Sequence, residues 1–522
     1  MEIIKDSSRI KLIVALATLM MALSAVAFVP ADMSDADGDF ISVSTWDELK
    51  DAAEDGPDEV YVILKNDIEV DDDAIEIGDE RYVEINLAGF KIDGCGDERL
   101  FEISGDETTV VYIYDGTLTG GRGDDGGCIY IDTAKEVHLE NVNLIGNYSD
   151  DDGGAIYVED KTLLEITGGK IADNACDGDG GAIYAEDDCC VKLKDVEIYG
   201  NHADDGDGGV LYSEYSVFEI RGCNIHDNYC SEDGGVIYAE GVTQYFIPYS
   251  IISGTIFSGN HTEDDDDSDG GAIRLYLTDL RMDSSTFDGN HCGCDGGAIY
   301  AEESELRINS STTFKNNSVP ESGGGLRLRC GLTVLTDTIF ENNHADANGG
   351  AIYANNGARL WITNITMTGN NVLGNGGGLL MGADKSDLSG SDNEYKFDGL
   401  VIIKDNTAKG NGSNVFIRSG QKIVCGEFEE GTAIGIELAK GTGKFTEKYS
   451  YWNEGIDPAK IFFSDNSKYY VALDPDSGEA KTYKESTGDD MSNDNTIWIV
   501  AGVIAAVVLI GAAAYFFIIR KP

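Results

Sequence analysis

The sequence of 522 residues has little positive charge. It contains 37 Lys and Arg residues against 95 Asp and Glu residues, which gives a formal net charge of −58. Nucleic-acid binding depends on basic side chains that contact phosphates, so the composition excludes direct nucleic-acid binding as the function. Because 42% of the residues are hydrophobic, the chain is too apolar to be disordered throughout.

Helical periodicity is also absent from the middle of the chain. No segment there has the apolar spacing of the amphipathic helix that a helical or leucine-rich solenoid needs in every repeat. Short stretches alternate between apolar and polar residues instead, as in 191–198, and Asn, Gly or Asp residues separate them. This pattern is typical of β-strands joined by tight corners.

Two motifs recur through this region with the same period. The first is a Gly-Gly pair followed by small or apolar residues, at steps of 26 to 28 residues with two longer steps of 36. The second is an Asn with an apolar residue three positions before it, as in Phe287-Asp-Gly-Asn290. The Gly-Gly pairs begin at Gly126, Gly153, Gly180, Gly208, Gly234, Gly270, Gly296, Gly323, Gly349 and Gly376, with a degraded copy near Gly412.

One repeat has room for about three short strands, which is one coil of a parallel β-helix with coils ~4.8 Å apart. We expect the repeated Asn to occupy a corner in the left-handed αL conformation and to bond its neighbours in a ladder. Gly-Gly supplies a second corner where a Cβ is excluded. The repeated aromatic residues are expected to stack inside the coils: Phe257, Phe287, Phe314 and Phe340. The pattern leaves open whether the Ile or the Tyr of the GGAIY motif faces inward.

The two ends of the chain predict its location. Basic residues precede an apolar run at 12–29, which contains a small-residue cleavage motif at 25–27, as in a secretory signal peptide. An uncleaved signal anchor is the alternative. The run 497–519 has no charge and is long enough to cross a bilayer, and basic residues follow it. A buried core helix is the alternative there.

The predicted organisation therefore has seven parts. A capping box at Thr45-Trp-Asp-Glu48 is expected to open a short helix that runs through Ala53 and covers the first coil. The parts are a signal peptide (1–31), an N-terminal cap and first coils (32–125), the repeat β-helix (126–420), terminal coils and a cap (421–484), an acidic linker (485–496), a transmembrane helix (497–519) and a cytoplasmic tail (520–522).

The 11 cysteines define neither a zinc site nor a disulfide pattern. Cys189-Cys190 and Cys292-Gly-Cys294 lack the paired CxxC spacing of structural zinc sites. In an exported chain cysteines can form disulfides, and the odd count leaves at least one unpaired. The sequence does not determine which residues pair.

The two motifs together carry a resemblance to known families. Phe287-Asp-Gly-Asn290 with Gly296-Gly-Ala-Ile299 resembles the repeats of chlamydial polymorphic membrane proteins. The pattern is also similar to β-helical, adhesin-like surface proteins of methanogenic archaea and gut bacteria, whose closing segment resembles Phe462-Phe-Ser-Asp-Asn466 and the residues after it. The resemblance spans 45–483 and implies an all-β, right-handed parallel β-helix of the pectin-lyase-like type. A single predicted C-terminal helix as the anchor favours a one-membrane or archaeal envelope.

An Asp precedes Gly-Gly in seven consecutive coils. Stacking in register would align these carboxylates ~4.8 Å apart, and aligned oxygens suit Ca²⁺, which takes six to eight oxygen ligands. The alternative is a hydrated Asx turn in each coil, and the known calcium repeat GGxGxDxUx is absent. The candidate calcium ladder consists of Asp125, Asp152, Asp179, Asp207, Asp233, Asp269 and Asp295.

The pectin-lyase-like fold also occurs in enzymes, but the sequence offers no catalytic set. The NTD and GHG clusters that the family's hydrolases lead one to seek are absent. Four of the six His residues directly follow a ladder Asn, so we interpret them as repeat positions on exposed corners rather than general bases. Arg274 and Arg327 replace the Tyr of GGAIY and form either a small basic spot or salt bridges to nearby acids.

Two insertions, at 241–269 and 382–396, lengthen single coils. Insertions in solenoids often lie on a binding face, although tolerated loop length is the alternative. The predicted function is that of a membrane-anchored, cell-surface adhesin-like β-helix that binds extracellular polysaccharide or a partner on another cell. The alternatives are a polysaccharide lyase or glycoside hydrolase, and a purely structural envelope protein. The sequence does not determine the oligomeric state.

Overall fold

A computed structural model describes residues 40–241, 249–263, 267–382 and 393–485. The chain divides into two compact units, Met1–Ile41 and Ser42–Pro522, and nearly all of the described residues belong to the second unit. The predicted signal peptide at 1–31, the transmembrane helix at 497–519 and the tail at 520–522 lie outside the described residues, as does the linker after Glu485. Within the described ranges, no helix combines the length and the apolar character needed to cross a membrane.

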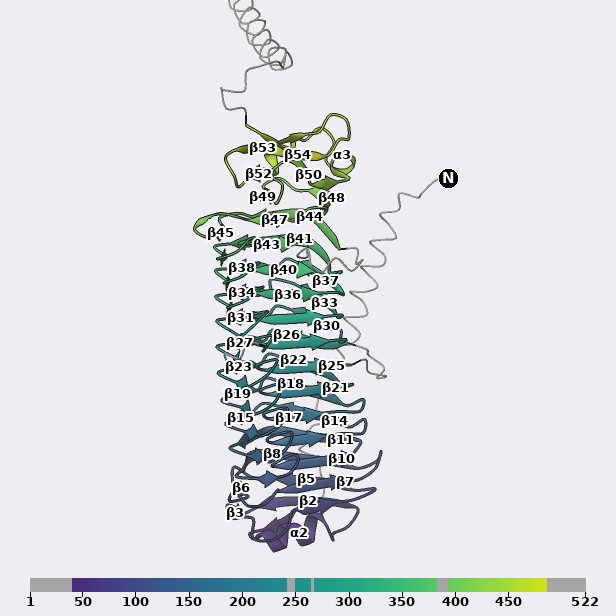
Figure 1. The fold of residues 1–522 in the computed structure, drawn as a ribbon. Coiled ribbons are helices and arrows are strands. Elements are labelled where there is room, and N and C mark those ends of the chain that lie inside the picture. Colours follow the sequence, from purple (N-terminus) through teal and green to yellow (C-terminus); the bar gives the residue numbers. More distant parts are fainter. Residues whose placement is uncertain (1–39, 242–248, 264–266, 383–392, 486–522) are drawn as a thin grey trace, which may run out of the picture. The chain divides into compact units, whose positions relative to one another are not determined.

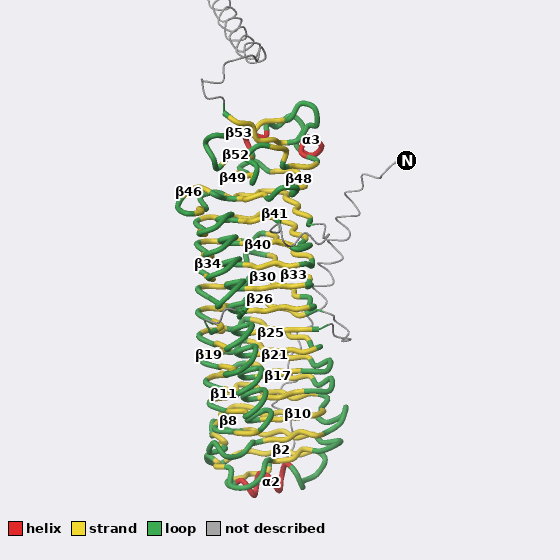
Figure 2. Tube along the Cα trace, in the orientation of Figure 1, coloured by secondary structure: helices red, strands yellow, loops and turns green. Residues whose placement is uncertain are grey.

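The second unit is a parallel β-solenoid of about 14 turns, as the sequence predicts for its class (Figures 1 and 2). The first coils contain β2 (Glu59–Leu64), β3 (Ile68–Glu69), β4 (Ile75–Ile77), β5 (Tyr82–Asn86), β6 (Lys91–Asp93), β7 (Phe101–Ser104) and β8 (Val110–Thr119). Each strand pairs in parallel with its equivalent one turn away, for example β5 with β2 and with β8.

The GGAIY motifs form the first face of the repeat coils. Its strands are β10 (Ile129–Thr133), β13 (Ile156–Val158), β17 (Ile183–Ala185), β21 (Leu211–Glu214), β25 (Ile237–Glu240), β29 (Ile273–Tyr276), β32 (Ile299–Glu302), β36 (Leu326–Arg329), β40 (Ile352–Asn355) and β43 (Leu379–Met381). The register aligns the motifs, because Ile156 pairs with Ile183 and Tyr157 with Tyr184.

The alternating stretches after each GGAIY motif form the second face. Its strands are β11 (Glu136–Ile145), β14 (Leu163–Thr167), β18 (Cys190–Lys194), β22 (Val217–Arg221), β26 (Ser250–Ser253), β30 (Leu280–Asp283), β33 (Glu305–Asn309), β37 (Leu332–Thr336), β41 (Arg359–Thr368) and β44 (Glu394–Ile403).

The residues just before the ladder Asn form the third face. Its separate strands are β15 (Lys170–Ala172), β19 (Glu197–Tyr199), β23 (Asn224–His226), β27 (Ile256–Ser258), β31 (Thr286–Asp288), β34 (Thr313–Lys315) and β38 (Ile339–Glu341). In β11, β41 and β44 one long strand serves the second and third faces.

Short strands after the ladder Asn complete each coil. One sheet contains β9 (Arg122–Gly123), β12 (Tyr148–Ser149), β16 (Ala175–Cys176), β20 (His202–Ala203), β24 (Tyr229–Cys230) and β28 (His261–Thr262). The other contains β35 (Ser318–Val319), β39 (His344–Ala345), β42 (Asn371–Val372), β45 (Thr407–Ala408) and β46 (Asn411–Gly412).

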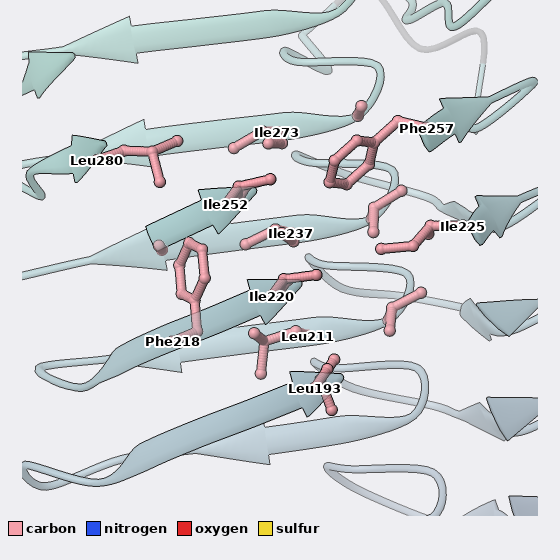
Figure 3. Close-up of a cluster of buried hydrophobic side chains, with 14 of the residues drawn as sticks. Leu193, Leu211, Phe218, Ile220, Ile225, Ile237, Ile252, Phe257, Ile273 and Leu280 are labelled. Carbon is pink, nitrogen blue, oxygen red and sulfur yellow. The ribbon is translucent and has the colours of Figure 1, made fainter. Parts of the chain in front are cut away.

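A continuous apolar core fills the coils, and it resolves the orientation of GGAIY. The Ile side chains of this motif point inward, as Ile237 and Ile273 do in Figure 3, and both are fully buried. The predicted Phe stack is confirmed, with the Phe257 and Phe287 ring centroids 4.6 Å apart. Since side chains alternate across a strand, the Tyr of each motif points away from the core, although Tyr184, Tyr212, Tyr300 and Tyr353 are themselves buried.

The Gly-Gly corner has two different steric causes. The first glycine has a positive φ, as at Gly153 with +64°, where a Cβ is strained. The second glycine contacts the next coil, because a Cβ on Gly154 would lie 2.3 Å from the carbonyl oxygen of Gly181. Neither position tolerates a side chain, which explains why the pair recurs.

The ladder of Asn side chains is confirmed, but its predicted backbone conformation is wrong. The buried Asn201 donates from its backbone N–H and its Nδ2 to Oδ1 of Asn228, at 3.0 and 2.9 Å. The residue before each ladder Asn has the positive φ instead, as at Gly200 and Asp227. The amide therefore turns inward from an ordinary backbone conformation while its neighbour makes the corner.

Both ends of the core are covered. At one end α2 (Trp46–Ala53) buries Trp46 and Leu49, and Thr45 Oγ1 accepts the Glu48 N–H at 3.2 Å, as the capping box predicts. Three coil strands precede the other end: β47 (Val415–Ile417), β48 (Ile423–Phe428) and β49 (Ala433–Leu438). There the chain forms β50 (Gly443–Lys444), β51 (Thr446–Glu447), α3 (Tyr449–Trp452), a 3₁₀ helix (Pro458–Lys460), β52 (Phe462–Ser464), β53 (Tyr469–Leu473) and β54 (Ala480–Lys484). One buried cluster extends from Val43 to Ala480, so residues 40–485 contain a complete core and both of its covers.

Candidate functional site

The seven Asp residues before Gly-Gly align along the solenoid as the sequence predicts. Oδ1 of Asp152 accepts the backbone N–H of Asp179 at 2.6 Å, and Oδ1 of Asp179 accepts that of Asp207 at 2.7 Å. The same bond recurs upward until Oδ1 of Asp295 accepts the Ser322 N–H. Each carboxylate thus accepts a backbone N–H of the next coil. The predicted alternative, an Asx turn, would instead place this hydrogen bond within one coil.

Burial makes ionisation of this ladder costly. It raises the pKa of Asp179 to about 6, of Asp207 to about 8 and of Asp269 to about 7. The backbone N–H of the next coil favours the ionised form and opposes the shift, whereas the neighbouring ladder carboxylates add to it. Near neutral pH some carboxyl groups in the central part of the ladder are therefore protonated and carry no charge.

A column of tyrosine rings lies beside the ladder. Tyr157 and Tyr184 stack with centroids 4.9 Å apart, and Tyr184 and Tyr212 with centroids 5.0 Å apart. Four of the hydroxyls donate to the glutamate two positions after the Tyr of the next coil, as Tyr130 does to Glu159 at 2.7 Å, whereas Tyr238 donates to Glu240 of its own coil at 3.3 Å. Burial raises the pKa of each of these phenols, so they remain neutral donors. The full column is Tyr130, Tyr157, Tyr184, Tyr212 and Tyr238, with Glu159, Glu186, Glu214 and Glu240 beside it.

Arg274 and Arg327 take the Tyr position in two later coils and connect the columns. Arg274 bonds Oδ2 of Asp233 at 3.3 Å and Glu302 at 3.1 Å, and its guanidinium lies 4.1 Å from the Tyr300 ring centroid. Arg327 bonds Oδ2 of Asp295 at 2.8 Å. Both side chains are nearly buried, which fits the salt-bridge interpretation and not an open basic spot. We call the Asp ladder with the Tyr and Glu columns the acidic face.

Four of the histidines and three of the cysteines lie at the corner that follows the ladder Asn. His261 and His291 stack with ring centroids 4.7 Å apart, which agrees with their interpretation as repeat positions. They are half-buried rather than exposed, because neighbouring rings cover their faces. The free, buried thiols of Cys176, Cys230 and Cys292 each donate to the carbonyl oxygen of the ladder Asp three residues later, at 3.3, 3.3 and 3.1 Å.

The metal-binding potential of the ladder is uneven. Among the described residues, one set of three possible ligands lies close together, with atoms of Asp269, Cys294 and Asp295 within 4.8 Å of one another. A thiolate suits softer ions than Ca²⁺, which prefers oxygen. The oxygens of Asp233 and Asp295 that do not accept a backbone N–H bond arginines instead. Calcium binding therefore remains a prediction for the coils nearer the N-terminus, which contain Asp125, Asp152, Asp179 and Asp207.

If calcium binds the ladder, it should stabilise the solenoid. Millimolar Ca²⁺ is expected to raise the melting temperature of residues 40–485, because a ligand that binds only the folded state stabilises it. Far-ultraviolet circular dichroism follows the transition, and Mg²⁺ at equal ionic strength is the control. An unchanged melting temperature would contradict the calcium hypothesis.

The Tyr and Glu columns are the functional residues that the sequence interpretation missed. A signal for them exists, since the Tyr of the GGAIY motif is followed two residues later by Glu in most coils, as in Tyr184-Ala-Glu186. Residues i and i+2 of a strand share a face, so this spacing places ring and carboxylate together. Of the two predicted insertions, residues 242–248, 264–266 and 383–392 lie outside the described residues.

Comparison with known proteins supports the repeat interpretation. The repeat model of the Chlamydia polymorphic membrane proteins matches residues 284–302 and 337–355, each of which joins a ladder Asn to a GGAIY motif. No curated protein matches the chain, and no solved structure matches it. The matched repeats and the β-solenoid together fit a β-helical surface protein with chlamydial-type repeats.

Proposed function

We propose that this chain is a cell-surface, adhesin-like β-helix that binds extracellular polymers along its acidic face. The observation that carries the proposal is the register of that face. Tyr hydroxyls and Glu carboxylates repeat once per coil from Tyr130 to Glu240, at the ~4.8 Å spacing of neighbouring strands. A repeated surface of this kind gains affinity from many weak contacts with a repeated ligand.

The charge of the face favours one class of polymer. The Glu carboxylates, and the oxygens of the Tyr hydroxyls that donate to them, accept hydrogen bonds from sugar hydroxyls, whereas a polyanion would meet the repulsion of the ladder. We therefore expect neutral polysaccharides to bind better than acidic ones in the absence of a divalent cation. The resemblance to chlamydial surface repeats supports an exposed location for such a face.

Affinity electrophoresis of residues 40–485 in neutral and acidic polysaccharides tests this proposal. Retardation is expected with at least one neutral polymer and should weaken at least about fivefold in Kd when the polymer is cut to short oligosaccharides, because fewer coils are engaged. The double variant Glu186→Gln/Glu214→Gln should weaken binding. Its matched control, Glu165→Gln/Glu219→Gln on the second face, should not.

The same incubations test the enzyme alternative. Release of reducing ends would indicate hydrolysis, and unsaturated uronate absorbance would indicate a lyase; either result contradicts the adhesin proposal. Absence of binding to every polymer, with the protein folded, would favour a purely structural envelope protein.

A further inference from the structure

Half of the large exposed hydrophobic side chains in the described residues lie in the C-terminal cap, which we define as residues 438–485. Large exposed hydrophobic side chains are scattered singly along the described coils, for example Tyr215 and Leu373. The cap carries six within 23 residues: Tyr451, Trp452, Ile456, Phe463, Tyr470 and Leu473. Concentrated apolar exposure of this kind marks an interaction surface.

Two aromatic pairs dominate this exposure. Tyr451 is 76% exposed and Trp452 48% exposed, and their rings pack edge to face with centroids 4.9 Å apart at the end of α3. Tyr470 of β53 stacks on Tyr483 of β54 across the antiparallel pair, 5.5 Å between centroids. Figure 1 places β53, β54 and α3 at the end of the coil stack opposite α2. The apolar exposure thus belongs to one end of the solenoid.

The charge of the cap also differs from that of the rest of the chain. It contains seven Lys and eight acidic residues, a net charge of −1, whereas the whole chain carries −58. Most of its acids have partners within the protein. Asp474 lies near Lys444 and Lys481, and Asp465 accepts from Asn414. Glu479 accepts the N–H groups of Lys448 and Tyr449. Exposed charges of both signs remain on the cap, with Lys448, Lys460, Lys468 and Lys484 on one side of the balance and Glu454, Asp457, Asp476 and Glu485 on the other.

The chain leaves the cap beside one of these aromatic pairs. Lys484 pairs with Tyr469 in the last strand, one position from the Tyr470–Tyr483 pair. Only 11 residues separate Glu485 from Ile497, where the charge-free run of 23 residues begins. An extended chain of that length reaches at most about 40 Å. If the run spans a bilayer, the cap therefore stays close to the membrane surface.

From these observations we propose that the cap docks on the lipid bilayer, with its exposed Trp and Tyr rings in the headgroup region and its lysines against anionic lipids. Trp and Tyr prefer this interface because they combine an apolar ring with a polar group. Lysines near the surface add attraction to anionic lipids. The strongly acidic coils do not oppose this contact, because charges beyond ~10 Å are screened at 0.1 M salt.

Flotation of residues 40–485 with vesicles of phosphatidylcholine and phosphatidylglycerol tests the proposal. This fragment lacks the charge-free run, so any binding comes from the folded part. The wild-type fragment should float with the vesicles at 0.1 M NaCl, more strongly as the anionic lipid fraction rises, and its tryptophan emission should shift to shorter wavelength. The variant Tyr451→Ser/Trp452→Ser should bind at least fivefold less.

The matched control is Tyr215→Ser/Ile256→Ser, which removes two exposed apolar side chains from the coils and should bind vesicles as the wild type does. Equal loss in both double variants, or no flotation of the wild-type fragment, would overturn the proposal. Cap-dependent dimerisation or cap-dependent polysaccharide binding without vesicle binding would also overturn it, because the surface would then have another occupant. Polymer binding at the acidic face is measured separately, so each proposal can fail alone.

Discussion

The variant Asp207→Asn should unfold at a temperature several degrees higher than the wild type at pH 8.5, and at nearly the same temperature at pH 4. Burial and neighbouring carboxylates raise the pKa of Asp207 to about 8, so its ionisation destabilises the folded state. A raised folded-state pKa gives stability that is complete below about pH 4, the unfolded value, and is lost as pH rises through 8. An amide keeps the Oδ1 acceptor and has no charge to lose.

The chain itself contains the precedent for this substitution. Asn348 and Asn375 occupy the position before Gly-Gly in later coils, where the backbone ladder continues through them. We expect a gain on the order of 1 to 3 kcal/mol at pH 8.5, less than the full pKa difference implies because the carboxyl is only partly buried and solvent screens it.

The matched control is Asp205→Asn, which removes a charge from the same corner at an exposed position. It should leave the pH dependence of the melting temperature as in the wild type. Melting curves between pH 4 and pH 9 give the comparison. The explanation fails if both variants change the curve equally, since the effect would then come from net charge and not from the ladder.

The variant Asn228→Ala should destabilise the coils around it by about 3 to 5 kcal/mol. Its Oδ1 accepts from the N–H and the Nδ2 of Asn201, and its Nδ2 donates to Ile198 O and to Asn260 Oδ1. All of these groups are buried, and each buried polar group left without a partner costs about 1–3 kcal/mol. The substitution leaves several such groups without partners at one site, and small shifts of the neighbouring coils cannot give all of them new ones.

Hydrogen exchange is the appropriate measurement for this variant. A solenoid can open locally, because each coil contacts only its neighbours. Protection should fall for the strands from β19 to β27 and stay near the wild-type level in β2 and β5. The control Asn411→Ala changes an exposed Asn outside the ladder and should change protection little. Uniform loss of protection along the whole chain would contradict the local role of the amide.

Sequence reasoning was most successful where the repeat itself carries the information. The period fixed the coils, the Asn ladder, the Phe stack and the alignment of the Asp residues, because parallel strands in register place equivalent residues beside each other. It failed where the answer depends on backbone detail. The residue before the ladder Asn has the αL conformation, as at Gly200 and Asp227. Gly and Asp both tolerate this conformation, but the repeat alone does not show which residue of the corner adopts it.

The terminal coils were harder to predict for a related reason. The ladder continues from Asn406 to Asn414, only eight residues later, and then to the carboxylate of Asp465. Neither step has the spacing of the repeat, so the period gives no indication of them. The partners of the ladder carboxylates, above all Arg274 and Arg327, likewise depend on contacts one and two coils away that a single repeat does not encode.

The bonds between successive ladder Asn residues have a direction, because each Asn donates to the amide oxygen of the next coil and accepts at its own amide oxygen from the coil before. From Asn147 to Asn406 every coil presents the same acceptor on one side and the same donor on the other. Any coil can consequently follow any other without a new partner having to arise. If the gene gains or loses the segment that encodes one coil, the coils that become neighbours still present complementary donors and acceptors. Relatives of this protein should therefore differ in length by whole coils more often than by parts of a coil.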